Sequence, residues 1–136
     1  MRVWTLAEAN AALPDVRRLL VDGRKALSNM REAETQIEDL RIVWGEELDK
    51  PTCPEWAEHR EQQQRRAAAL DAVANVIEKF EEMGCEAKDL DSGLVDFRGQ
   101  LGNEVVYLCW RDGEKEIRNW HSLSGGFSGR KTIPGL

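Results

Sequence analysis

Two long stretches with apolar residues at helical spacing constrain the fold of this chain more than any other feature. The apolar positions fall three, four or seven residues apart, which places them on one face of a helix. Residues 45–54, GEELDKPTCP, separate the two stretches and contain one glycine and two prolines, which favour a turn. The pattern predicts two long helices joined as an antiparallel hairpin of the coiled-coil type. The expected seam consists of Val16, Leu20, Gly23, Leu27, Met30, Ile37 and Trp44 in one helix and Trp56, Gln63, Leu70 and Ile77 in the other.

The ends of the helical region carry recognisable signals. Thr5 and Glu8 have the spacing of a capping box, in which each side chain accepts a hydrogen bond from the other residue's backbone amide. Pro14 removes a helical hydrogen bond, so we expect a short first helix to break near Leu13 before the long one begins. Gly84 is suited to the left-handed conformation that ends a helix, and it predicts the end of the second long helix.

After Gly84 the pattern changes to that of β-strands. Residues 94–97 form one predicted strand, and EVVYLCWR, residues 104–111, is rich in β-branched and aromatic side chains. EIRNWHS, residues 116–122, follows across Asp112-Gly113, a strong hairpin signal. We therefore predict an α+β protein with one domain over residues 1–136, in which residues 1–84 form the helical hairpin region and residues 85–136 a small antiparallel sheet with a glycine-rich tail.

The expected hairpin also predicts which residues share a face. With a tight loop of two or four residues, paired positions sum to an odd number, so Cys109 and His121 fall on opposite faces. This separation argues against a catalytic Cys-His pair, whereas a three-residue loop would reverse it. Cys109, His121 and Asp96 also lack the closely spaced ligand pairs of structural zinc sites, so we predict no metal site, no cofactor and no catalytic residue.

Composition limits the partners and the compartment. The chain has 25 acidic and 19 basic residues and a formal charge of −6, which disfavours binding to nucleic acids. Its apolar runs are short and no charged-then-apolar leader opens it, so we expect no membrane association and no secretion. Its 3 cysteines cannot all pair with one another, which favours a reducing compartment, the cytoplasm.

The segment SGGFSGR, residues 124–130, is the most suggestive of ligand binding. Glycines allow backbone amides to approach an anion, and an arginine can bind a carboxylate or phosphate through two hydrogen bonds. The alternative is a structural tail in which Phe127 packs on the core and Arg130 pairs with an acid such as Asp96. The candidate ligand-binding residues are His121, Arg130, Asp96, Asn119 and Trp110.

Several blocks of the sequence resemble an uncharacterised bacterial family, the domain of unknown function 2203. They span nearly the whole chain, and the resemblance implies a shared fold without a mechanism. The blocks are WTLAEANAALP at 4–14, GLVDF at 93–97, YLCW at 107–110, Gly113-Glu114, Trp120-His121 and GFSGR at 126–130.

These features favour a non-catalytic interaction or regulatory module that self-associates through its helical hairpin, as a dimer, and that could also engage another protein. A two-helix arm buries little apolar surface alone, which is the reason to expect a second copy. The alternative is a small-ligand or anion-binding protein, with an enzymatic role left open, whose site lies near His121 and the loop of residues 126–130.

Overall fold

The computed structural model describes residues 2–135, and the chain forms two compact units. One unit contains the chain up to residue 22 and from residue 76 onward, and the other contains residues 23–75. The predicted α+β class is confirmed, because two long helices are followed by a five-stranded antiparallel sheet. No helix within residues 2–135 is both long enough and apolar enough to cross a membrane.

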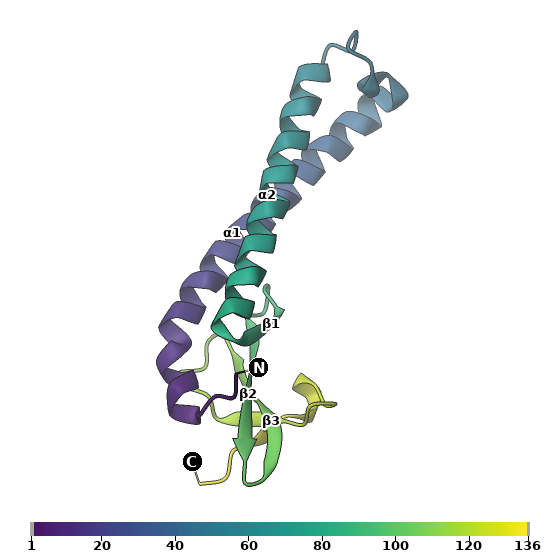
Figure 1. Cartoon of the computed structure of the whole chain (residues 1–136). Coiled ribbons are helices and arrows are strands. Elements are labelled where there is room, and N and C mark those ends of the chain that lie inside the picture. The colour runs from purple at the N-terminus through teal and green to yellow at the C-terminus, as the bar shows by residue number, and fades with distance from the viewer. Residues whose placement is uncertain (1, 136) are drawn as a thin grey trace. The chain divides into compact units, whose positions relative to one another are not determined.

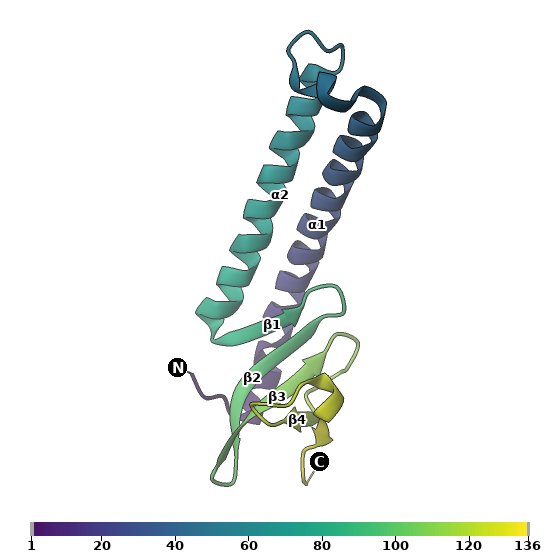
Figure 2. The ribbon, with the colours of Figure 1, turned by 90° about the vertical axis from the view of Figure 1, so that its right-hand side faces the viewer.

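The two helices are α1 (Leu6–Trp44) and α2 (Trp56–Met83), and they form the predicted hairpin. In the unit of residues 23–75 they run side by side in opposite directions (Figures 1 and 2). A short 3₁₀ helix, η1 (Gly45–Asp49), and a turn connect them in the expected place. Gly84 follows α2 with φ of 91°, a conformation that glycine adopts without strain, so the predicted helix end is confirmed.

The start of α1 confirms the capping box and corrects the expected break at Pro14. The Thr5 amide donates to Glu8 Oε1 at 2.8 Å, and the Glu8 amide donates to Thr5 Oγ1 at 3.1 Å. Pro14 lies inside a continuous helix, so the break predicted near Leu13 was wrong. Burial of Leu13, Val16 and Leu20 explains the continuity, because packing of an apolar face outweighs one missing backbone hydrogen bond.

The seam of the hairpin differs from the predicted one in α2. Gln62, Ala69 and Val76 are buried at seven-residue spacing, each one position before a predicted seam residue. Leu70, a predicted seam residue, is 41% exposed. In α1 the buried positions include Ala26 and Ala33 rather than Leu27 and Met30. Three of these buried positions, Ala26, Ala33 and Ala69, are therefore small residues.

The sheet has the order β1-β2-β3-β4-β5, and every neighbouring pair is antiparallel. The Gly102-Asn103 turn joins β2 to β3, with Leu101 paired to Glu104 and Gly102 at φ of 60°. The second strand is longer than the predicted 94–97 because this tight turn returns the chain directly into β3. The strands are β1 (Cys85–Asp89), β2 (Leu94–Leu101), β3 (Glu104–Arg111), β4 (Asn119–His121) and β5 (Lys131–Thr132), with a 3₁₀ helix η2 (Phe127–Gly129) before β5.

One face of the sheet forms the core of its unit. Apolar side chains at alternate positions of β2 and β3 are fully or almost fully buried, as are Phe80 of α2 and Trp4. The Trp4 and Phe97 rings meet edge to face with centroids 5.1 Å apart, and Trp4 Nε1 donates to the Gly84 carbonyl at 2.8 Å. Each such buried side chain contributes about 1.5–3 kcal/mol to folding. The strand residues of this core are Val95, Phe97, Val106, Leu108 and Trp110.

The pairing of β3 with β4 reverses the face assignment made from sequence. Tyr107 pairs with His121 and Cys109 with Asn119, so paired positions sum to an even number and Cys109 and His121 share a face. Asp112-Gly113 does form a turn, closed by the Glu114 amide donating to the Arg111 carbonyl at 3.0 Å. Residues 115–118 then extend the connection before β4 begins, and the extra length shifts the pairing.

Candidate functional site

The face of the sheet opposite the core carries a row of polar residues. Asp96 of β2 lies directly opposite Cys109 of β3, and Cys109 lies directly opposite Asn119 of β4. His121 follows Asn119 by two residues and therefore projects from the same face. Three neighbouring strands thus place a carboxylate, a thiol and an imidazole close together.

Asp96, Cys109 and His121 form a compact, buried cluster, which we call the DCH cluster. One potential metal-ligand atom from each residue lies within 4.8 Å of those from the other two. All three residues are at most 3% exposed. His121 Nε2 and Asp96 Oδ2 are 2.9 Å apart, which is a hydrogen-bond distance. Buried polar groups in this proximity need one another or a bound ligand to offset their loss of water.

The second nitrogen of His121 fixes the orientation of its ring. Nδ1 lies 2.8 Å from the backbone carbonyl oxygen of Ser122. A carbonyl can only accept, so Nδ1 carries a proton and donates it to this carbonyl. Nε2 therefore faces Asp96, and one further proton must lie between Nε2 and the carboxylate to form that hydrogen bond. The DCH cluster thus holds one exchangeable proton between a base and an acid.

Burial dominates the electrostatics of the DCH cluster. Burial raises the pKa of the Asp96 carboxyl group, and the nearby His121 opposes this shift through its charge and its hydrogen bond. Burial also raises the pKa of the Cys109 thiol to about 12, and the charge of Asp96 contributes in the same direction. The thiol is therefore protonated and weakly nucleophilic at neutral pH. A catalytic cysteine needs the opposite shift, so the proximity of His121 does not make Cys109 a nucleophile.

A cavity of about 290 Å³ opens over the DCH cluster. Lys88 brings a positive charge to its lining, and Leu94, Leu123 and Phe127 bring apolar surface. Residues between 123 and 127 contribute part of the lining, and the turn at their start is fixed by the Gly125 amide donating to Ser122 Oγ at 3.0 Å. The ten residues that line the cavity are Lys88, Leu94, Asp96, Tyr107, Cys109, His121, Leu123, Gly125, Gly126 and Phe127.

Two of the predicted site residues lie elsewhere. Arg130 forms an ion pair with Glu114, with Nη2 at 2.9 and 3.0 Å from the two carboxylate oxygens, instead of with Asp96. Trp110 is completely buried on the core face, where its Nε1 donates to the Glu114 carbonyl at 3.0 Å. Neither residue is part of the cavity lining. Of the five predicted residues, Asp96 and His121 line the cavity, while Asn119 is the cross-strand neighbour of Cys109.

The residues that sequence reasoning missed are Cys109, Lys88 and Tyr107. Cys109 was set aside because of the assumed tight loop, and the signal against that loop was Ile117. This residue is buried, and its amide donates to Asn10 Oδ1 of α1 at 2.7 Å. Ile117 therefore belongs to the connection between β3 and β4 and not to a strand, which makes this connection longer than a tight turn.

Tyr107 lies between the DCH cavity and a smaller one of about 230 Å³, because it lines both. Its hydroxyl donates to Glu86 Oε1 at 3.1 Å and accepts from Arg98 Nη2 at 3.3 Å. The centroid of its ring lies 5.3 Å from that of His121, and Lys88 Nζ lies 5.4 Å from the same Tyr107 centroid. Tyr107 therefore supports the His121 ring and closes one side of the DCH cavity.

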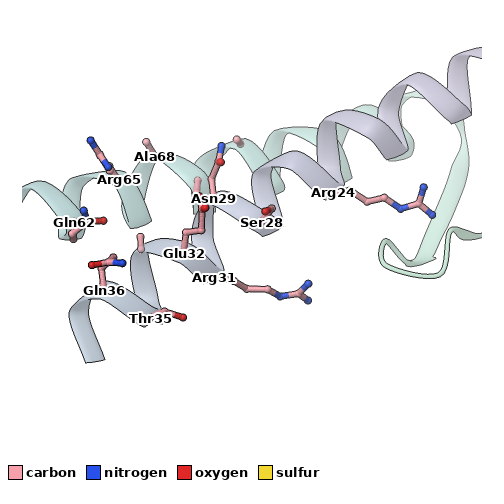
Figure 3. A pocket seen from close by; sticks show the side chains of 13 residues that line it. Arg24, Ser28, Asn29, Arg31, Glu32, Thr35, Gln36, Gln62, Arg65 and Ala68 are labelled. Atoms are coloured by element: carbon pink, nitrogen blue, oxygen red, sulfur yellow. The ribbon is translucent and has the colours of Figure 1, made fainter. Parts of the chain in front are cut away.

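A larger hollow of about 920 Å³ lies between α1 and α2 in the unit of residues 23–75. Figure 3 shows side chains from both helices along it, with Gln62 and Arg65 from α2 and Asn29 and Glu32 from α1. Its lining includes one acidic residue and neither histidine nor cysteine. This groove therefore offers no cluster of donors comparable with the one on the sheet.

Comparison with known proteins assigns the chain to a family. No significant match was found among curated proteins or among solved structures. The family described as "Uncharacterized conserved protein (DUF2203)" matches residues 2–133, which include both helices, all five strands and the DCH cluster. The chain belongs to the DUF2203 family.

Proposed function

We propose that this protein binds a divalent transition-metal ion, Zn²⁺ in the first place, through Asp96, Cys109 and His121. The observation that carries the proposal is the convergence of three different donors, from three adjacent strands, to within 4.8 Å of one another beside a cavity. A thiolate and an imidazole favour zinc over magnesium or calcium, which prefer oxygen ligands.

The distances are close to those that an ion requires. Zinc lies about 2.3 Å from sulfur and about 2.0–2.2 Å from nitrogen or oxygen, so its tetrahedral ligands are about 3.5 Å apart. Asp96 and His121 are already closer than this, at 2.9 Å, because a proton rather than an ion joins them. All three ligand atoms lie within 4.8 Å of one another, so the widest separation must shrink by at most about 1.3 Å, which small side-chain rotations can provide.

The hydrogen bond from His121 Nδ1 to the Ser122 carbonyl supports the same assignment. Histidines that bind metals almost always donate their other ring N–H to a carbonyl or carboxylate, which fixes the ring and raises its basicity. Here that bond leaves Nε2 directed at Asp96. The imidazole is therefore oriented as a metal ligand before any ion binds.

Titration of the reduced protein with Co²⁺, a spectroscopic substitute for Zn²⁺, tests the proposal. We expect one ion per chain, a thiolate-to-cobalt absorption band in the near ultraviolet, and displacement of the cobalt by Zn²⁺. The Cys109→Ser variant should lose the band and bind at least about 100-fold more weakly, since loss of even an outer-shell partner costs 10–100-fold. Binding should also release the thiol proton, because Cys109, with a pKa of about 12, is protonated at neutral pH.

Cys85→Ser provides a matched control for this experiment. Cys85 is as buried as Cys109, and burial raises the pKa of its thiol to about 12 as well, but its side chain lies on the core side of β1. This variant should keep the band and the affinity of the wild-type protein. Absence of the band in the folded wild-type protein, or its loss in Cys85→Ser instead of Cys109→Ser, would contradict the proposed site.

We also propose that the protein self-associates through the unit of residues 23–75, as a dimer with a coiled-coil-like contact. The observation that favours this is the exposure of large apolar side chains there: Ile42 is 76% exposed, Val43 72% and Leu70 41%. Burying such residues against a second copy would contribute about 25 cal/mol for each Å² removed from water.

Light scattering on a size-exclusion column tests this second proposal. We expect the wild-type protein to have twice the mass of the single chain, and an Ile42→Lys, Val43→Lys variant to have the mass of one chain. Helical content by circular dichroism should be equal in both, because these side chains make no contribution to the buried core. A wild-type monomer at high micromolar concentration would reject the dimer.

The cytoplasm remains our proposed compartment. Cys53, Cys85 and Cys109 are all free and buried, and none forms a disulfide. Free thiols persist most readily where glutathione and thioredoxin keep them reduced. A cysteine binds zinc as a free thiolate, and the same reducing conditions keep the thiol free.

A further inference from the structure

We infer that the metal centre has three protein ligands and a free fourth coordination position. We infer further that this position binds a small monoanion, namely a carboxylate attached to an apolar group. The inference deepens the proposed metal-binding function and rests on it. It concerns the side of the DCH cluster that faces the cavity, where Lys88 and three apolar side chains surround the space in front of the three donors.

The first step is the number of protein ligands. Zinc sites with three protein ligands usually hold water or a substrate in the fourth position, whereas purely structural sites have four protein ligands. Two other cavity residues carry potential donor atoms, and both are bound to Glu86. Lys88 Nζ lies 2.6 Å from Glu86 Oε2, and the Tyr107 hydroxyl donates to Glu86 Oε1. The fourth position is therefore left to a molecule in the cavity.

The second step is charge. The two positive charges of the ion are matched by the Asp96 carboxylate and the Cys109 thiolate, so the filled centre is neutral. Lys88 brings a positive charge to the cavity lining, and its ion-pair partner Glu86 lies outside that lining and offsets part of this charge. A monoanion that binds the ion can approach the Lys88 ammonium group, where a charge-assisted hydrogen bond would stabilise it.

The third step is size and polarity. The cavity of about 290 Å³ is at the lower limit of ligand pockets, which typically have about 300–1,000 Å³, so its occupant is small. Leu94, Leu123 and Phe127 offer an apolar surface, and Leu123 and Phe127 are 47% and 39% exposed. Residues this large remain exposed at a cavity edge where an apolar ligand body can cover them.

Benzoate is a suitable probe, and benzyl alcohol is its uncharged counterpart with the same ring. We expect benzoate to change the visible absorption of the Co²⁺-loaded protein in a saturable way, and benzyl alcohol to bind at least about tenfold more weakly. At saturating Co²⁺, Lys88→Gln should weaken benzoate binding about tenfold, the lower end of what a charged hydrogen bond contributes. Lys131→Gln is the matched control, because Lys131 lies over the Trp120 ring and not in the cavity lining.

The outcomes separate the inference from the proposed function. If the protein binds Co²⁺ with the thiolate band but benzoate leaves the visible spectrum unchanged, the open position is wrong and the metal site stands. If benzoate and benzyl alcohol bind equally, the assignment of a monoanion is wrong. Failure to bind Co²⁺ would remove both the metal site and this inference.

Discussion

Replacing His121 by alanine should lower the free energy of unfolding of the metal-free protein by about 3–5 kcal/mol. The substitution leaves the Asp96 carboxyl group, only 3% exposed, without its hydrogen-bond partner at 2.9 Å. Removing one member of a buried pair typically costs this much when the other member stays charged, because that charge then lies unpaired in a medium of low dielectric constant. Urea unfolding followed by circular dichroism, with a chelator present, measures the loss.

A double variant tells this electrostatic cost apart from a simple loss of packing. Replacement of a buried pair by apolar residues of similar volume is often neutral or stabilising. Asp96→Leu, His121→Leu should therefore be more stable than His121→Ala alone, although it loses all capacity to bind metal. If His121→Ala costs less than about 1 kcal/mol, Asp96 must reach water or another partner when His121 is absent.

Replacing Trp110 by alanine should have a destabilising effect of similar size, about 3–5 kcal/mol, for a different reason. Trp110 is completely buried in the core face, so the truncation opens a large cavity and also removes the hydrogen bond from its Nε1 to the Glu114 carbonyl at 3.0 Å. The midpoint of thermal unfolding should fall by many degrees. The DCH cavity should be unaffected, since Trp110 is not part of its lining.

Trp120→Ala is the matched control for Trp110→Ala. Trp120 lies on the neighbouring strand and the same face of the sheet but is only half-buried, with Lys131 over its ring at 5.4 Å. Its loss should be clearly less destabilising. Equal effects of the two substitutions would show that the core does not depend on Trp110 in the way its burial implies.

Local signals predicted the helical part of the fold well. The capping box of Thr5 and Glu8, the turn of residues 45–54 and the helix end at Gly84 depend on residues close in sequence, and all three are present. Pro14 is also a local signal, but it misled because burial of the surrounding apolar residues outweighs its effect. The predicted seam in α2 was wrong because we chose the large apolar residue Leu70 as a seam position. Helices approach each other most closely at small residues, and here the buried residue is Ala69.

The site depended on information that local patterns do not contain. Asp96 and His121 were predicted as candidates; both line the cavity, and His121 Nε2 lies 2.9 Å from Asp96 Oδ2. Cys109 joins them only because seven residues, 112–118, separate the end of β3 from the start of β4 at Asn119, whereas a tight turn would begin β4 directly after Asp112-Gly113. A change of one residue in the pairing moves every side chain of a strand to the other face. Faces could therefore not be assigned from the hairpin signal alone.

The same connection has a consequence for how this sequence can vary. Surface connections between strands usually tolerate insertions and deletions, since few contacts depend on their length. In residues 112–118, however, a change in length that slipped the β3-β4 pairing by one residue would turn His121 toward the core and leave Asp96 and Cys109 with no imidazole beside them. The register of β4, and with it the site, therefore depends on the connection that precedes it, including the buried anchor Ile117.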